Sequence, residues 1–204
     1  MFLYFNGCSY TIGSELDDIE GQRFSTLVSK HFKANHLNDS VGGGSNDLIT
    51  MRTLDFLDKN TCDAAIIMLT HSERMRFNRN VIPIRDPFFY ETYYTDEVGS
   101  LNFYRNRYIL EQEFEKKNIP LVLMQYHNVY GDNVYSRRCK GKLQTIANLT
   151  LMDNILDKEE TLLGRRKNKE YYYNDIKKRS LCHFNYKGHK KIADWIIGKL
   201  TSTI

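Results

Sequence analysis

A serine near the start of the chain and a histidine near its end are the residues best suited to covalent chemistry. Ser9 lies in the hydroxyl-rich segment GCSYTIG (7–13), directly after a short apolar run, and His183 lies just before a predicted C-terminal helix. A serine hydroxyl becomes a nucleophile when an adjacent imidazole accepts its proton. Such a pair would suit acyl transfer. The plainer alternatives are that Ser9 caps a helix and that His183 is a hydrogen-bonded loop residue.

Two other segments carry groups that could donate hydrogen bonds to a negatively charged oxygen. One is a glycine triplet centred on Gly43, which lacks a Cβ, so its amide can approach a ligand closely. Three polar residues follow the third apolar run: His71, Ser72 and Arg74. Alternatively, the glycines form an ordinary turn and the second segment is only the end of a strand.

These residues must be positioned by a sheet, because apolar runs alternate with helical patterns along the chain. Continuous apolar runs predict strands buried on both faces, and amphipathic periodicity predicts helices. The predicted strands cover residues 2–5, 35–39, 63–70 and 119–126, and the predicted helices cover 23–33, 45–60, 100–118 and 185–200. This alternation predicts the α/β class, with a doubly wound, flavodoxin-like parallel sheet of about five strands in a three-layer α/β/α arrangement.

The polar segments all follow predicted strands, which places them at one edge of that sheet. Ser9 follows the first strand, the glycine triplet the second, and Ser72 the third. The carboxyl ends of parallel strands meet at the edge where open α/β sheets bind ligands. In a flavodoxin-like order the first and third strands are neighbours, so Ser9 and Ser72 would flank the switch point. The loop before the last helix can return to this edge and bring His183 close to Ser9.

The ends and faces of the helices have signals of their own. Ser45 and Asn185 are the predicted N-caps of the helices over 45–60 and 185–200. Asn46 and Asp47 are interpreted as part of a helix start, and His189 as a packed histidine on an apolar stripe. The spacing predicts that four residues share one apolar face of the helix over 45–60: Leu48, Met51, Leu54 and Leu57.

Four segments, in order, resemble the sequence blocks of the SGNH (GDSL-like) hydrolases. Residues 7–13 resemble the first block, usually Gly-Asp-Ser-x-Thr-x-Gly, and NDSVGGGSND (38–47) resembles the second, where a glycine follows an asparagine by five residues. LTHSER (69–74) stands in the place of the third block, and HFNYKGHKKIADWI (183–196) is similar to the fifth. The resemblance implies Ser9 as nucleophile, His183 as base, and Gly43 and Ser72 as oxyanion donors.

The chain departs from the family pattern at three positions. Cys8 replaces the usual aspartate before the nucleophile, with its side chain expected to point away from the site, and Ser72 replaces the asparagine of the third block. His71 or Arg74 could supply that donor instead. Ser180 stands where the family has an aspartate that orients the catalytic imidazole. The alternatives are a Ser–His dyad with a backbone carbonyl, another acid such as Asp175, or an inactive site.

Composition bounds the remaining expectations. With 204 residues, 29 basic and 25 acidic side chains and a net charge of +4, the chain is expected to form one domain over 1–204. Insertions near 75–99 and 129–180 would form the walls or lid of a cleft, or pack against a partner subunit. Four cysteines and six histidines show no metal-binding spacing, so no metal or other cofactor is expected. No signal peptide or membrane segment is recognisable, which favours a cytoplasmic protein, with virion association left open.

The most favoured function is an SGNH-type serine esterase, with a small-molecule or glycan ester as substrate, O-acetyl carbohydrate being one candidate. A non-catalytic binding or structural protein that retains this fold is the main alternative. Basic clusters at 137–142, 164–169 and 177–180 leave a polyanion contact open, although the sequence has no nucleic-acid-binding motif. No membrane partner is expected, and homo-oligomerisation is left open.

Overall fold

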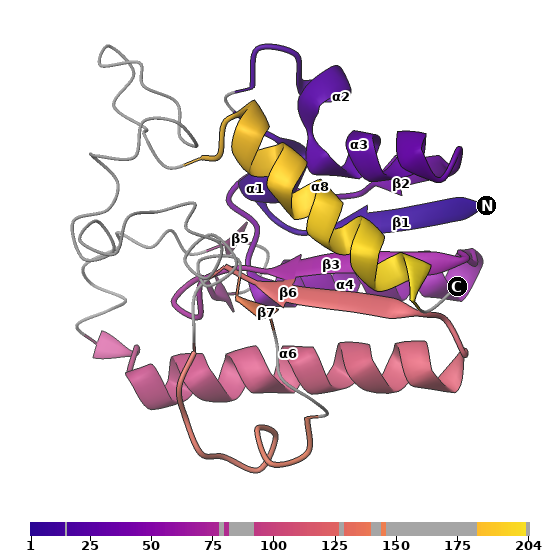
Figure 1. Ribbon diagram of the computed structural model, residues 1–204. Coiled ribbons are helices and arrows are strands. Elements are labelled where there is room, and N and C mark those ends of the chain that lie inside the picture. The colour runs from indigo at the N-terminus through magenta and orange to yellow at the C-terminus, as the bar shows by residue number, and fades with distance from the viewer. Residues whose placement is uncertain are drawn as a thin grey trace.

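A five-stranded parallel sheet organises the chain in the computed structural model, which describes residues 1–14, 16–77, 80–81, 92–126, 129–139, 144–145 and 183–202. The strands are β1 (Phe2–Asn6), β2 (Asn35–Asn38), β3 (Ala64–Leu69), β6 (Leu121–Gln125) and the two-residue β7 (Gln144–Thr145). Their order is β2-β1-β3-β6-β7, and every pairing is parallel (Figure 1). The predicted adjacency of the first and third strands is therefore confirmed.

Helices cover both faces of the sheet, which gives the predicted three-layer arrangement (Figure 1). The helices are α1 (Ser9–Ile12), α2 (Ile19–Gln22), α3 (Phe24–His31), α4 (Asn46–Lys59), α6 (Asp96–Lys116) and α8 (Tyr186–Thr201). Helices α3 and α8 pack on one face, where Phe5 of β1 contacts the core cluster that contains Phe24 and Ile192. Helices α4 and α6 pack on the other face, where Tyr4 contacts the cluster that contains Phe103.

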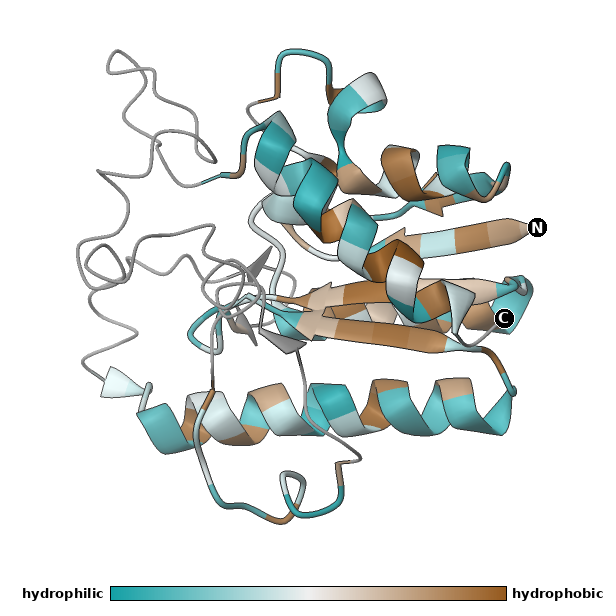
Figure 2. Cartoon of the chain, viewed as in Figure 1, coloured by the Kyte–Doolittle hydropathy of each residue, from teal (hydrophilic) through white to brown (hydrophobic). Residues whose placement is uncertain are grey.

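The central strands β1 and β3 have the hydrophobicity that burial on both faces requires. Successive strand side chains point to opposite faces, so Leu3 and Phe5 join one core and Tyr4 joins the other. Every residue of β3 is buried, and the central strands are largely apolar in Figure 2 while the helices carry polar outer faces. The continuous apolar run of β3 is explained by the burial of both faces of this strand.

Capping side chains define where three of the helices begin. Ser45 accepts a hydrogen bond from the Leu48 N–H at the start of α4, and Asn185 accepts one from the Gly188 N–H at the start of α8, as predicted. Helix α6 begins at Asp96, earlier than predicted, because the Thr95 hydroxyl caps it. The predicted stripe of α8 is confirmed, with five residues buried: His189, Ile192, Ala193, Ile196 and Leu200.

The buried face of α4 differs from the one predicted. Leu57 is buried as predicted, but Met51 is 40% exposed. The buried face also includes Ile49, Thr53 and Phe56. The reason is a polar network inside the α4 layer: the Asn6 amide donates to the Thr53 hydroxyl and to the Ile49 carbonyl, both at 3.0 Å. A threonine can be buried when its hydroxyl is hydrogen-bonded, so polar residues occupy part of the buried face of α4, where the spacing predicts apolar residues only.

The two predicted insertions lie only partly within the described residues. A short antiparallel hairpin, β4 (Arg76–Phe77) and β5 (Asn80–Val81), lies in the first, and α6 takes up its end. In the second, the described parts are residues 129–139 and β7. Their roles as cleft walls or lid stay predictions. Over the described residues, no helix is both long and apolar enough to cross a membrane.

Candidate active site

Ser9 and His183 lie in hydrogen-bonding contact, although they are 174 positions apart in the chain. The Ser9 Oγ and the His183 Nε2 are 2.8 Å apart. Ser9 is the first residue of α1, directly after β1, and only 8% of its surface is exposed. His183 lies just before α8. The sheet edge therefore brings together the two residues that are predicted to be nucleophile and base.

A tight turn after β1 holds Ser9 in place. A Cβ added at Gly7 would lie 2.1 Å from the Thr11 Oγ1 and 3.1 Å from the Met68 carbonyl oxygen, so only glycine fits there. The Gly7 N–H donates to the Asn6 side chain at 2.7 Å. Cys8 is the N-cap residue of α1, and its side chain is fully buried in the core, away from solvent. Ser9 is consequently inside the helical turn and is not its cap.

A row of aromatic rings begins beside the His183 imidazole. Its ring centroid lies 4.9 Å from that of Tyr10, with 51° between the ring planes. Tyr10 in turn stacks on Tyr126, which follows β6, at 4.1 Å and 26°. His71 contacts the other end of this row, with its ring 4.8 Å from the Tyr126 ring. The row of rings connects the candidate base to the segment after β3.

His189 anchors the helix that follows the candidate base, in the packed role predicted for it. It is fully buried, its Nδ1 accepts a hydrogen bond from the Phe24 N–H at 3.2 Å, and its ring stacks on Phe24 at 5.6 Å. Burial, together with a smaller effect of the nearby His183, lowers the pKa of His189 to about 3. His189 is therefore neutral at ordinary pH and joins α8 to the start of α3.

The glycine triplet forms an exposed turn beside the end of β1. Gly43 has a φ of +71°, and a Cβ added there would meet no atom within 4 Å. The Val41 N–H donates to the Gly7 carbonyl at 3.3 Å, which ties this turn to the segment before Ser9. Among the hydrogen bonds of the described residues, none uses the Gly43 N–H as donor. The Gly43 amide is thus accessible near the Ser9 turn, as an oxyanion donor must be.

Asn46 has a structural role that the sequence does not predict. It begins α4 as expected, but its fully buried side chain also binds the end of β3. Its Oδ1 accepts from the Thr70 N–H at 2.8 Å, and its Nδ2 donates to the Thr70 and His71 carbonyls at 3.3 and 3.4 Å. The only sequence signal is its position, shortly after the glycine turn that follows β2. Strands β2 and β3 lie on either side of β1. Asn46 links two candidate oxyanion segments.

The three candidate donors after β3 have different neighbours. The Ser72 hydroxyl hydrogen-bonds the Tyr94 side chain, whose pKa is raised mainly by burial. The Arg74 Nη1 donates to the Thr70 hydroxyl at 3.2 Å. His71 contacts the Tyr126 ring, and its Nδ1 lies 3.8 Å from a Glu73 carboxylate oxygen. Which of the three reaches a bound oxyanion stays a prediction.

The predicted supporting residues Asp175 and Ser180 lie outside the described residues, as do Cys182 and the two more distant basic clusters. In the first basic cluster, the Arg137 guanidinium forms an exposed ion pair with Asp132 at 3.1 Å. That pairing reduces the free positive charge that a polyanion would meet. Within the part of the chain that is described, no three His, Cys, Asp or Glu side chains are grouped to hold a metal ion.

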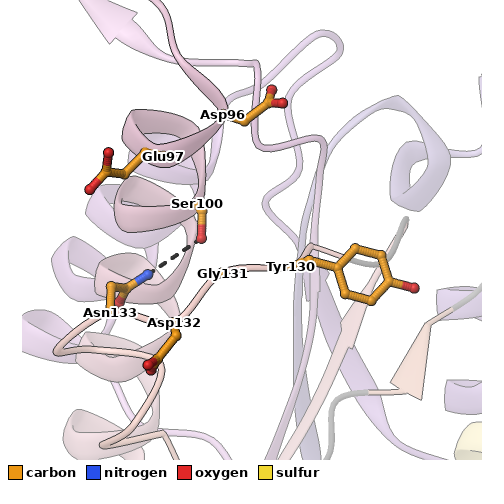
Figure 3. A pocket seen from close by; sticks show the side chains of 7 residues that line it. All are labelled: Asp96, Glu97, Ser100, Tyr130, Gly131, Asp132 and Asn133. Atoms are coloured by element: carbon orange, nitrogen blue, oxygen red, sulfur yellow. Dashed lines mark hydrogen bonds between the residues drawn. The ribbon is translucent and has the colours of Figure 1, made fainter.

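A hollow of about 250 Å³ lies between the first turns of α6 and the loop after β6 (Figure 3). Its lining carries three carboxylates and neither Ser9 nor His183; the lining residues are Asp96, Glu97, Ser100, Tyr130, Gly131, Asp132 and Asn133. The Asn133 amide donates to the Ser100 hydroxyl at 3.3 Å and holds the loop against the helix. This hollow is acidic and separate from the Ser9–His183 pair.

Comparison with known proteins shows which fold the chain has. No protein-family model and no curated protein matches the chain. Among solved structures, the esterase EstA from Pseudoalteromonas sp. is similar with a TM-score of 0.58 and 11% identity, covering 98% of this chain and 97% of that one. The acetyl xylan esterase AlAXEase is similar with a TM-score of 0.54 and 16% identity, over 98% and 99% of the two chains.

A structure described as belonging to the lipolytic G-D-S-L family, from Desulfitobacterium hafniense, has a TM-score of 0.55 and 12% identity over 96% of this chain and 97% of that one. Identities this low establish the fold alone. The chain therefore has the SGNH/GDSL hydrolase fold that its four sequence blocks resemble, over nearly its whole length.

Proposed function

We propose that this protein is a serine hydrolase of the SGNH type that cleaves an acyl ester through an acyl-enzyme intermediate. The observation that carries the proposal is the 2.8 Å contact between the Ser9 Oγ and the His183 Nε2. A nucleophile and its base must be within hydrogen-bond reach, and this pair is. The contact also lies at the carboxyl edge of a parallel sheet, where folds of this class bind ligands.

The chemistry follows from the geometry of the pair. The His183 Nε2 accepts the Ser9 proton while the Ser9 Oγ forms a bond to the ester carbonyl carbon. The negative charge on the carbonyl oxygen is met by the Ser9 N–H and the Gly43 N–H, each worth about 3 kcal/mol in the transition state. His183 then gives its proton to the leaving alcohol, and water, activated by the same imidazole, releases the acid.

The substrate class extends this proposal one step further. Among the proteins with the same fold, AlAXEase is an acetyl xylan esterase, and another is a two-domain esterase active on acetylated mannans. Both proteins are named for activity on acetylated polysaccharides. We therefore place O-acetyl carbohydrate first among the substrates to test, ahead of other short acyl esters.

The alternative is a non-catalytic protein with this fold, and two specific observations support it. Ser180 replaces the family aspartate in sequence. The Ser72 hydroxyl, at the place of the family asparagine, is engaged with Tyr94. Removal of a triad carboxylate alone can lower turnover about 10⁴-fold. A protein that binds an acylated ligand without cleaving it would tolerate both changes.

Turnover of defined esters separates the two functions. The wild-type protein is incubated with p-nitrophenyl acetate and with acetylated xylan, and released nitrophenol or acetate is measured. Hydrolysis should fall at least about 100-fold in Ser9→Ala and in His183→Ala. Ser14→Ala, five positions further along the same turn, is the matched control and should keep the wild-type rate. Hydrolysis that persists in both site variants would place the activity elsewhere.

A further inference from the structure

Tyr10 is the residue after the candidate nucleophile, and its ring contacts the candidate base. Both Ser9 and Tyr10 belong to α1, so one helical turn presents a hydroxyl to the His183 Nε2 and an aromatic ring to the imidazole. The ring centroids of Tyr10 and His183 are 4.9 Å apart. This distance is within the range in which a cation is attracted by an aromatic face, up to about 6 Å.

The position of the Tyr10 ring is fixed by its other neighbours. Tyr10 is only 3% exposed. It stacks on Tyr126 at 4.1 Å and meets Phe184, the residue after His183, at 5.3 Å and 53°. Because these contacts come from the end of β6 and from the start of the α8 segment, the Tyr10 ring cannot turn without disturbing both. It therefore offers His183 a rigid surface.

We propose that Tyr10 is a positioning residue that orients His183 and stabilises its charged form during catalysis. When His183 accepts the Ser9 proton it becomes a cation, and the electron-rich face of Tyr10 attracts that cation more strongly than the neutral imidazole. In the family, an aspartate three residues before the histidine orients and stabilises the imidazolium. This chain has Ser180 at that position in the sequence, and the Tyr10 ring lies beside the imidazole.

This inference rests on the proposed function for its catalytic part, and on geometry for its positioning part. The ring, and not the phenol hydroxyl, carries the effect, because the attraction comes from the π-system. Tyr10→Phe should therefore keep the wild-type behaviour. Replacement of the Tyr10 ring by an aliphatic side chain should slow the reaction and leave substrate affinity unchanged, since the interaction strengthens only when His183 is charged.

The first test measures the second-order rate at which a fluorophosphonate labels Ser9. Tyr10→Phe should label within about twofold of wild type, and Tyr10→Leu about tenfold more slowly. Phe24→Leu is the matched control, since Phe24 is a fully buried ring of the same core cluster that lies against His189. Phe24→Leu should lower the free energy of unfolding without a comparable loss of labelling rate. An unchanged rate in a folded Tyr10→Leu, or an equal loss in Tyr10→Phe, would overturn the proposal.

A second test does not depend on Tyr10→Leu folding. Phenylalanines with one, two and three ring fluorines are placed at position 10, which changes the electron density of the ring and hardly changes its shape. The labelling rate should fall with each added fluorine. A flat series would show that Tyr10 only fills space, and would overturn the charge-stabilising role.

A third measurement separates this inference from the proposed function. In protein with isotopically labelled histidine, the imidazole C–H signals of His183 should show a ring-current shift that is kept in Tyr10→Phe and lost in Tyr10→Leu. His183→Ala assigns the signals. If the wild type does not label but the shift is present, the hydrolase proposal fails and the positioning contact stands. If the shift is absent in wild type, the contact and this inference both fail.

Discussion

The side chain of Asn46 hydrogen-bonds both backbone groups of Thr70, so the start of α4 is fixed directly to the end of β3. The three bonds to Thr70 and His71 span 2.8 to 3.4 Å, and the Asn46 side chain is fully buried. Two loops that would contribute to an oxyanion hole are thereby held at a set separation. Preorganised donors of this kind are what electrostatic catalysis requires.

Asn46→Ala should weaken both stability and reactivity. The change leaves the Thr70 N–H and carbonyl without their buried partner, which costs about 1–3 kcal/mol of unfolding free energy. Urea denaturation measures this loss, and fluorophosphonate labelling measures the effect on the site. Asn60→Ala is the matched control, because Asn60 donates only to the Phe56 carbonyl at the far end of the same helix. Equal effects of the two variants on the labelling rate would contradict this role of Asn46.

Gly43→Ala and Gly42→Ala form a matched pair in the glycine turn. Neither added methyl group meets a close neighbour, but only Gly43 has a left-handed φ, at +71°. A non-glycine residue in that conformation costs about 1–2 kcal/mol. Gly43→Ala should therefore lose about that much stability and label more slowly, because relaxation of the turn moves the amide that donates to the oxyanion. Gly42→Ala should match wild type in both measurements. A wild-type labelling rate in Gly43→Ala would remove this amide from the proposed site.

His189 should make stability depend on pH. Its pKa is lowered from an ordinary 6.5 to about 3 in the folded protein, so the unfolded chain binds the extra proton between these values. The unfolding free energy is therefore unaffected by this group above about pH 6.5. It decreases as the pH falls from 6.5 toward 3, because the unfolded chain is stabilised by binding the proton. At pH 5 the loss is on the order of 2 kcal/mol.

The comparison of His189→Gln with wild type isolates this effect from other titrating groups. The glutamine variant should show a flatter unfolding free energy between pH 7 and 4.5, because its side chain does not titrate. His31→Gln, at an exposed position near the end of α3, should keep the wild-type slope. Parallel pH profiles for wild type and His189→Gln would contradict the burial of a neutral imidazole.

Much of the fold could be predicted because its signals are local. The run at β3 is apolar throughout, since the strand is buried on both sides, and the caps Ser45 and Asn185 mark helix starts one turn before their apolar residues. The closeness of Ser9 and His183 could also be predicted, because Ser9 follows the end of β1 and His183 precedes the start of α8, at the same edge of the sheet. Their chemical roles remain predictions.

Other features depend on contacts between distant segments and could not be predicted from local patterns. The buried face of α4 is set by a hydrogen-bond network that starts at Asn6 in β1, and periodicity within the helix cannot detect it. The contact of Tyr10 with His183 requires α1, the end of β6 and the start of α8 to be placed first. The amide bonds of Asn46 likewise require the neighbouring strand end.

Covalent labelling of Ser9 by a fluorophosphonate, located by mass spectrometry of the modified peptide, is the decisive test of whether His183 activates this serine. We expect one modified residue, Ser9, in wild-type protein between pH 6 and 9, and no modification in Ser9→Ala or His183→Ala. Absence of labelling in a well-folded wild-type protein, or labelling of Ser9 that continues without His183, would contradict the claim that the imidazole activates this serine.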